Sequence, residues 1–123
     1  MIRGLGIDII EVARINKVLE GENGRSFLER VFTSTESDYC RRHRSSAKHF
    51  AGRWAAKEAI AKALGTGLRE EINWTDIEIL NDDQGKPYVI LSGRLNQKFE
   101  NPNIMISISH CDTHASAVAI WTT

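Results

Sequence analysis

The sequence predicts an α+β fold in which an antiparallel sheet packs on one long helix. Residues 104–109 alternate apolar and polar side chains, and an apolar run follows at 115–121 after a short polar turn, as expected of a β-hairpin. The alanine-rich stretch 47–64 is too long for an ordinary strand and ends at Gly65, a common stop signal for a helix. With 123 residues, of which 41% are apolar, the chain can form one domain covering residues 1–123 but not two ordinary ones.

Before the long helix, the pattern predicts one strand and three short helices. The apolar residues of 1–10 alternate loosely, which favours a strand. Apolar residues spaced by three and four along 11–19 share one face of a helix, which the glycine-containing run 20–24 ends. A helical turn or two should follow around Phe27. The sequence from Thr33 to Glu36 is a capping box that should start the third helix.

After the long helix, the pattern predicts two hairpins with a short helix between them. Residues 76–80 and 87–91 flank Asn-Asp-Asp-Gln-Gly-Lys, a typical hairpin turn sequence. Ser92 is a suitable N-cap for a helix over 91–99. The C-terminal hairpin described above completes the sheet.

Composition and charge exclude several classes of protein. Lysine plus arginine and aspartate plus glutamate number 16 each, so the net charge of zero gives no reason to expect nucleic acid as a partner. No apolar run approaches the roughly 20 residues that span a bilayer, and an N-terminus interrupted by Arg3 and Asp8 makes a poor signal peptide. Cys40 and Cys111 lack metal or redox spacing and are expected to be free thiols in a reducing cytoplasm.

The alanine-rich helix carries an unusual set of charged residues. Arg53 and Lys57 are four apart, as are Glu58 and Lys62, so each pair lies on one side of a helix. They belong to a basic block, 39–62, with seven lysines and arginines against one glutamate. Such a block is either a solvated face or an anion site. Cations with one carboxylate would suit a polyphosphate and its metal ion, and the alanines leave room for a strand or ligand close to the helix.

Two carboxylates are candidate metal ligands. Asp8 ends an apolar strand in which Gly4 and Gly6 permit close backbone approach, and Glu58 lies on the long helix. Together they offer hard oxygen atoms, and Mg²⁺ typically takes one or two carboxylates with phosphates and waters. The ordinary alternatives are that Asp8 is the N-cap of the next helix and that Glu58 is a surface residue of the long helix, since glutamate is a good helix former.

Two further groups could bind phosphate. His110 follows an Ile-Ser-Ile-Ser strand and is either structural or a donor to a phosphate oxygen. Gly65-Thr66-Gly67 is either a routine helix end or a loop whose amides and hydroxyl bind phosphate. It is not a P-loop, because GxxxxGK[ST] is absent. The sequence also lacks the GxSxG elbow of serine hydrolases and the second Cys/His cluster of a zinc site.

Three longer segments occur in a specific order and spacing: GLGIDIIEVARI at 4–15, FAGRWAAKEAIAKALGTG at 50–67 and SISHCDTHASAVAI at 107–120. Together they closely resemble the bacterial holo-acyl-carrier-protein synthases, the short members of the 4′-phosphopantetheinyl transferase superfamily. Gly85-Lys86-Pro87 and the segment Phe32 to Glu36 match that pattern as well. The resemblance covers nearly the whole chain, and the joint signature is far more specific than any of its parts.

The resemblance implies an activity and a set of site residues. Such enzymes move the 4′-phosphopantetheine arm of coenzyme A to a serine of an acyl carrier protein and release adenosine 3′,5′-bisphosphate, in fatty acid biosynthesis in the cytoplasm. By resemblance, Asp8 and Glu58 hold Mg²⁺ at the pyrophosphate, and Glu58, Lys62 and His110 are catalytic. Glu58 is a candidate base, directly or through a metal-bound water. The groups expected to bind coenzyme A are Arg53, Lys57, Lys62, Gly65, Thr66, Gly67 and His110.

The resemblance also implies partners. Carrier proteins of this family are acidic around the modified serine, so a basic and partly apolar surface should receive them. Arg14 matches the carrier-contact region of the family. Its expected neighbours, which could equally be ordinary surface and core residues, are Lys17, Arg25, Phe27 and Arg30. Short members of the family form trimers with active sites shared between subunits, which implies a homotrimer here.

Three other hypotheses compete with this function. A catalytically idle coenzyme A or nucleotide binder would be expected to lose Asp8, Glu58 or Lys62, and the chain keeps all three. A nucleic-acid-binding module would need a basic surface with interleaved aromatic residues, which the neutral net charge does not favour. A plain structural domain would use the alanine-rich helix for packing alone.

Overall fold

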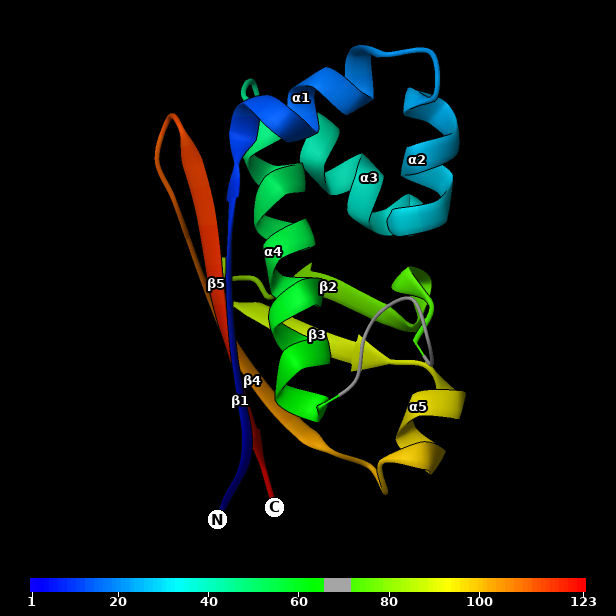
Figure 1. The fold of residues 1–123 in the computed structure, drawn as a ribbon, viewed down its shortest axis with the longest axis vertical. Helices are drawn as coiled ribbons and strands as arrows, with labels where there is room; N and C mark the ends of the chain where they lie inside the picture. The colour runs from blue at the N-terminus through cyan, green and yellow to red at the C-terminus, as the bar shows by residue number, and fades with distance from the viewer. Residues whose placement is uncertain (66–71) are drawn as a thin grey trace.

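The long helix α4 (Ser46–Leu64) runs through the centre of the molecule, with a sheet along one side and the short helices that precede it in the chain packed near its start (Figure 1). The computed structural model describes residues 1–65 and 72–123. The other helices are α1 (Val12–Glu20), α2 (Gly24–Val31), α3 (Ser34–Arg41), the 3₁₀ turn η1 (Trp74–Asp76) and α5 (Gly93–Lys98). The strands are β1 (Ile2–Glu11), β2 (Ile77–Asn81), β3 (Pro87–Leu91), β4 (Asn103–His110) and β5 (His114–Thr122).

The strands form two antiparallel sheets rather than the one sheet that was expected. The larger has the order β1-β5-β4, and the smaller is the hairpin β2-β3. The predicted α+β class, with antiparallel strands on a long helix, is confirmed. The two termini lie side by side (Figure 1), and the Met1 ammonium donates to the Thr123 hydroxyl at 3.1 Å. Within the described residues, no helix combines the length and the apolar character needed to cross a membrane.

Small residues let α4 lie unusually close to the large sheet. The alanines of β5 at 115, 117 and 119 are buried, as are those of α4 at 51, 55, 59 and 63. On β1, a Cβ added to Gly4 would lie 1.9 Å from the Ala63 carbonyl oxygen, and one added to Gly6 would lie 1.9 Å from that of Ala59. Backbone therefore touches backbone here, which fixes the position of α4 along β1.

The two faces of β1 have different surroundings. Because side chains alternate along a strand, Gly4, Gly6 and Asp8 share the face that meets α4. The apolar residues between them point the other way, and Leu5, Ile7 and Ile9 are each 65–68% exposed. Met105 on β4 is exposed as well. The outer face of the sheet is thus apolar and uncovered in the single chain.

The predicted helix boundaries agree closely with those in the structure. Thr33 and Glu36 form the expected capping box at the start of α3: the Glu36 amide donates to the Thr33 hydroxyl, and the Thr33 amide donates to the Glu36 carboxylate. Ser92 caps α5 by accepting from the Leu95 amide. Gly65 ends α4 with φ at 79°, a conformation that favours glycine.

Candidate active site

Asp8 and Lys62 meet where β1 packs on α4. The Lys62 ammonium donates to the Asp8 carboxylate at 3.2 Å and to the Ile7 carbonyl oxygen at 2.9 Å. The Asp8 side chain is 17% exposed and that of Lys62 is 54% exposed, so the pair stands at the surface and can be reached by a ligand. The residue at the N-cap of α1 is Glu11. The alternative role of Asp8 as an N-cap is therefore wrong.

Glu58 occupies the helix position next to this pair. It precedes Ala59, whose carbonyl oxygen defines the contact with Gly6, and it lies one turn before Lys62 on the same side of α4. Alternation along β1 puts Asp8 on the strand face that α4 covers. The packing thus brings both carboxylates to the same edge of the β1–α4 contact, and both are oxygen donors of the kind that Mg²⁺ prefers.

The carboxylates of Asp8 and Glu58 fit a metal ion whose other ligands come from the substrate and from water. No group of three or more histidine, cysteine, aspartate or glutamate residues with metal-binding geometry occurs in the described part of the chain. Two protein carboxylates are nevertheless the usual protein share of a magnesium site on a phosphate substrate, where phosphate oxygens and waters complete the shell. Lys62 would compete with the ion for Asp8 and could turn to a phosphate once the ion is bound.

A separate basic cavity of about 190 Å³ lies between α4, the β2-β3 hairpin and the end of β4. Arg53 forms part of its wall: the side chain is almost fully buried, donates from Nη2 to the Asn81 side-chain oxygen and stacks its guanidinium 4.2 Å above the Tyr39 ring. The Nε of Arg53 is buried without a hydrogen-bond partner among the described residues. The residues that line the cavity are Tyr39, Lys48, His49, Gly52, Arg53, Asn81, Gly85, Pro87, Ile108 and His110.

Three histidines form a row that ends in this cavity. The rings of His43 and His49 stack at 3.8 Å, and those of His49 and His110 meet edge to face at 5.4 Å. The pKa of His49 is lowered to about 4, first by burial and then by the charges of His43, His110, Arg53 and Lys48. Without a ligand in the cavity, the His49 side chain is therefore uncharged at pH 7.

The sequence predicts His110 and Arg53 as site residues but does not single out His49, Lys48 or Asn81. His49 lies four residues before Arg53 on α4, so helical spacing alone could have identified it. Lys48 binds the Asp112 carboxylate at 2.6 Å, which closes the cavity toward the β4–β5 turn. No sequence signal indicates that Asn81 of β2 receives the Arg53 guanidinium, because that contact depends on where the small sheet packs.

The predicted role of Lys57 in binding coenzyme A is wrong. Its side chain is completely buried, and its ammonium donates to the Glu36 carboxylate at 2.7 Å and to the carbonyl oxygens of Val31 and Trp74 at 2.7 and 3.1 Å. All three protons of the ammonium are used, so none remains for a ligand. The carboxylate of Glu36 also accepts from the Ile79 amide. Lys57 thus ties α4 to α2, α3, η1 and β2.

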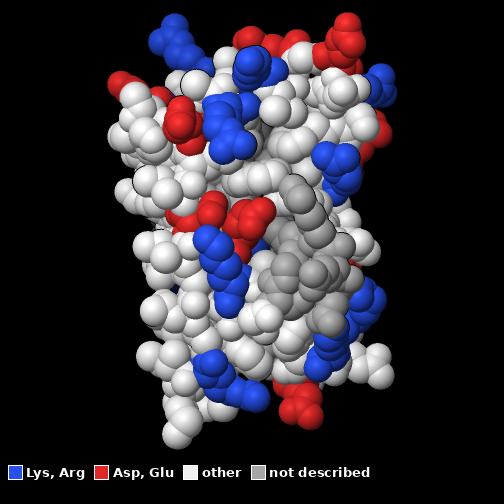
Figure 2. All heavy atoms as spheres, viewed as in Figure 1, with Lys and Arg blue, Asp and Glu red and all other residues white. Residues whose placement is uncertain are grey.

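The predicted carrier-docking residues divide into two groups. Phe27 is buried and stacks on Trp54 at 5.7 Å, which in turn stacks on Trp74 at 4.2 Å. It packs largely in the core, at 8% exposed, and its contact with a carrier protein stays a prediction. The basic residues are all exposed on α1 and α2: Arg14, Lys17, Arg25 and Arg30. On the face shown in Figure 2, basic side chains stand singly or in small groups among acidic ones, so this face has no continuous basic surface of the kind that binds nucleic acid.

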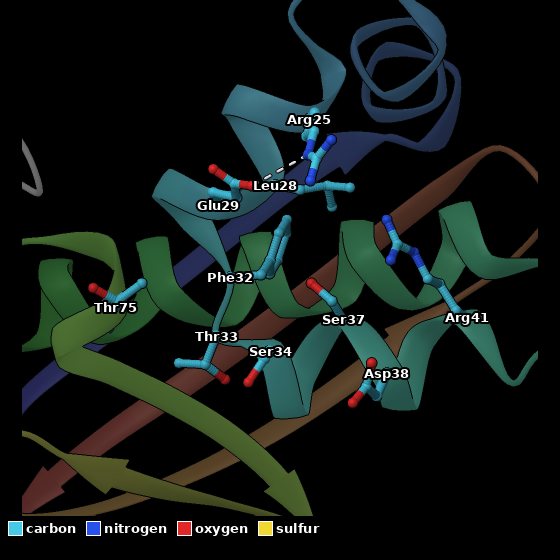
Figure 3. A pocket seen from close by; sticks show the side chains of 10 residues that line it. All are labelled: Arg25, Leu28, Glu29, Phe32, Thr33, Ser34, Ser37, Asp38, Arg41 and Thr75. Atoms are coloured by element: carbon cyan, nitrogen blue, oxygen red, sulfur yellow. Dashed lines mark hydrogen bonds and ion pairs between the residues drawn. The ribbon is translucent and has the colours of Figure 1, made fainter.

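A larger cavity, of about 430 Å³, lies away from the candidate site between α2 and α3. Figure 3 shows Phe32 and Leu28 beside it, with charged side chains from both helices around it. Arg25 is engaged there by Glu29 at 3.4 Å, so much of the local charge is already paired. Of the predicted site residues only Arg25 lines this cavity.

The described chain does not bring all predicted site residues together. Asp8 and Lys62 meet at the β1–α4 contact, one helical turn after Glu58, whereas Arg53 and His110 face the basic cavity, which none of the first three lines. Gly65 ends α4 next to Leu64. The predicted phosphate loop continues through Thr66 and Gly67, which lie outside the described residues. A single chain thus presents two partial sites.

Comparison with known proteins places this arrangement in a family. The model of the 4′-phosphopantetheinyl transferase superfamily matches residues 4–120, and the chain belongs to that superfamily. Within it, the chain is 52% identical over 121 residues to the holo-[acyl-carrier-protein] synthase of Protochlamydia amoebophila, with 98% of each chain covered. The resemblance expected from the three sequence segments is therefore confirmed.

Two solved structures support the same placement. The holo-(acyl-carrier-protein) synthase of Bacillus anthracis, in complex with CoA (3′,5′-ADP), has a TM-score of 0.83 and 40% identity over 98% of this chain and 96% of that one. The holo-[acyl-carrier-protein] synthase of Helicobacter pylori, in complex with coenzyme A, has a TM-score of 0.86 and 34% identity over 96% and 99%. The fold and the sequence thus point to the same group of enzymes.

Proposed function

We propose that this protein is a holo-[acyl-carrier-protein] synthase that acts as one domain over residues 1–123. It transfers the 4′-phosphopantetheine group of coenzyme A to a serine of an apo acyl carrier protein and releases adenosine 3′,5′-bisphosphate. The observation that carries the proposal is full-length similarity to such synthases, two of them solved with coenzyme A or its nucleotide. The chain keeps Asp8 and Lys62 within hydrogen-bond distance of each other, with Glu58 one helical turn before Lys62.

The reaction is a phosphoryl transfer, and positioning with electrostatic stabilisation accounts for most of the catalysis in such reactions. The serine oxygen forms a bond to the β-phosphorus of the pyrophosphate, the bond from that phosphorus to the bridging oxygen breaks, and the serine proton passes to a base. Glu58 is the nearest candidate base, directly or through a water. The Lys62 ammonium, half exposed beside Asp8, would stabilise negative charge on the phosphate oxygens.

We assign the metal site to Asp8 and Glu58. When bound, Mg²⁺ would polarise the pyrophosphate oxygens and offset the charge that develops on the leaving nucleotide. The two carboxylates would hold the ion, with phosphate oxygens and waters as its other ligands.

The division of the site residues supports an active site shared between subunits. The Asp8 cluster lies at one edge of the chain and the Arg53–His110 cavity at another. The outer face of the sheet next to Asp8 is apolar and exposed at Leu5 and Ile7, and large exposed apolar patches commonly mark protein interfaces. We propose a closed homotrimer in which the cavity of one subunit meets the Asp8 cluster of the next.

Subunit complementation tests this arrangement directly. We expect Asp8→Asn and His110→Gln to be poorly active when each is expressed alone. Co-expressed in equal amounts, they form mixed trimers in which about a quarter of the shared sites are wild type at both positions, so activity should recover toward that level. Mixtures no more active than the separate variants would contradict a shared site, provided that sedimentation shows mixed trimers.

The carrier protein is the expected macromolecular partner, and we place the reaction in the cytoplasm and in fatty acid biosynthesis. Arg14 and Lys17 on α1, with Arg25 and Arg30 on α2, offer exposed cations to an acidic carrier surface. Charge-steered docking of this kind weakens as salt is added. The alternative, an idle coenzyme A binder, predicts no carrier dependence at all.

Product release separates these two functions. Adenosine 3′,5′-bisphosphate should accumulate only when coenzyme A, Mg²⁺ and an apo carrier are all present, as measured by liquid chromatography. Glu58→Gln should reduce the rate strongly, because the metal site loses one negative charge. Glu100→Gln, an exposed glutamate that follows α5, is the matched control and should leave the rate unchanged. Release without a carrier, or a fully active Glu58→Gln, would contradict the proposal.

A further inference from the structure

Two members of the histidine row beside the basic cavity, His43 and His49, have no role in the proposed transfer reaction. His49 lines the cavity between Lys48 and His110, and His43 stacks behind it at 3.8 Å. The Nδ1 atom of His43 lies 2.9 Å from the Tyr39 carbonyl oxygen, to which it can only donate, so the orientation of this ring is fixed. The row therefore connects the cavity wall to the last turn of α3.

The groups that face His49 are almost all cationic or able to become so. They come from every element packed around it: Tyr39 and His43 from α3 and the turn after it, Lys48 and Arg53 from α4, and His110 from β4. The nearest carboxylate, Asp112, is already bound to Lys48. A free cavity with these walls opposes a proton on His49. An anion in the cavity reverses the balance, because an opposite charge within about 4–6 Å favours the charged form of a group.

We propose that His49 is a further phosphate-binding residue of this site, which takes up a proton when a phosphate of coenzyme A enters the cavity lined by His49, Arg53 and His110. This inference rests on the proposed function for the identity of the ligand. His49 lies outside the charged cluster at Asp8, so it is an additional ligand-binding residue. Its uptake of a proton makes the affinity for coenzyme A depend on pH. His43 holds the His49 ring in place from behind and acts as a positioning residue.

The size of the effect follows from proton linkage. The pKa of His49 lies near 4 in the free protein. If a bound phosphate restores it to the ordinary histidine value of about 6.5, binding at pH 6.5 takes up about half a proton at this residue. Affinity then rises about tenfold between pH 7.5 and pH 5.5 from this residue alone, relative to a protein that lacks it.

Calorimetry measures this proton uptake directly. Coenzyme A is titrated into the full-length protein at pH 6.5 in several buffers with different heats of ionisation, and the slope of the observed heat gives the number of protons taken up. His49→Gln should take up about half a proton less than the wild type. Taking the difference between the two cancels protons exchanged by the phosphates of the ligand, whose second pKa lies near 6. His114→Gln, an exposed histidine that does not line the cavity, is the matched control and should equal the wild type.

The outcomes separate this inference from the proposed function. Equal proton uptake by the wild type and His49→Gln would overturn the inference while leaving the transferase function intact. Absence of any binding of coenzyme A would overturn the proposed function as well. His49→Asn serves as a second variant should His49→Gln fail to fold, and the circular dichroism spectrum decides that question before titration.

Discussion

Replacing Lys57 with methionine tests whether this buried lysine of the long helix supports structure or ligand binding. The wild-type ammonium makes three short contacts, at 2.7, 2.7 and 3.1 Å, in a site without solvent exposure. Methionine fills a similar volume but leaves the Glu36 carboxylate buried and uncompensated. Breaking a buried ion pair in this way costs about 3–5 kcal/mol, a large share of the 5–15 kcal/mol that typically stabilises a domain.

Thermal unfolding followed by tryptophan fluorescence measures this loss. For a chain of this size we expect a fall in melting temperature of roughly 12–20 °C. Glu36→Gln added to Lys57→Met removes the uncompensated charge and should recover part of the loss. The matched control is Lys62→Met, on the same helix but half exposed, which should change stability by less than about 0.5 kcal/mol while reducing activity.

The opposite pattern would refute this reasoning. Lys57→Met with wild-type stability and lost affinity for coenzyme A would show that Lys57 contacts the ligand. Measured at a temperature where the variant is fully folded, affinity for coenzyme A should instead match the wild type, because the side chain does not reach the surface.

Three further perturbations test the fold, the histidine row and the docking surface. Gly6→Ala places a methyl group 1.9 Å from the Ala59 carbonyl oxygen and should cost about 3 kcal/mol in urea unfolding; a loss below 0.5 kcal/mol would contradict the close contact. Because the pKa of His49 is lowered to about 4 on folding, the unfolded chain binds more protons between pH 6.5 and 4, so stability falls as the pH is lowered through that range. His49→Gln should reduce this loss of stability at low pH. Thermal melts in which the stability of the variant depends on pH as it does in the wild type would contradict this prediction. Arg14→Ala should raise the Kd for apo carrier several-fold in low salt without changing the Kd for coenzyme A. Arg44→Ala, which removes another exposed arginine, is the control. Equal effects of the two changes on the Kd for carrier would remove Arg14 from the docking surface.

Much of the fold follows from local sequence patterns. The capping box at Thr33, the stop at Gly65 and the N-cap at Ser92 each act within a few residues, so the sequence specifies them directly. The pairing of strands depends instead on contacts between distant segments. The sequence therefore predicted antiparallel strands but not their division into two sheets.

The same distinction explains which site residues could be predicted. The approach of Asp8 to α4 follows from Gly4 and Gly6, whose lack of side chains indicates close packing. Burial is harder to infer, because Lys57 and Lys62 look alike in sequence and differ only in what packs around them. The acceptor that makes Lys57 structural, Glu36, lies 21 residues away on another helix.

The transfer reaction is tested most directly by intact-mass spectrometry of an apo acyl carrier protein incubated with this protein, coenzyme A and Mg²⁺. The account predicts a gain of about 340 Da, the mass of the phosphopantetheine arm, which EDTA abolishes and which Glu58→Gln makes far slower. Several apo carriers that gain no mass, although the protein binds coenzyme A, would contradict the account and favour a binding protein without transferase activity.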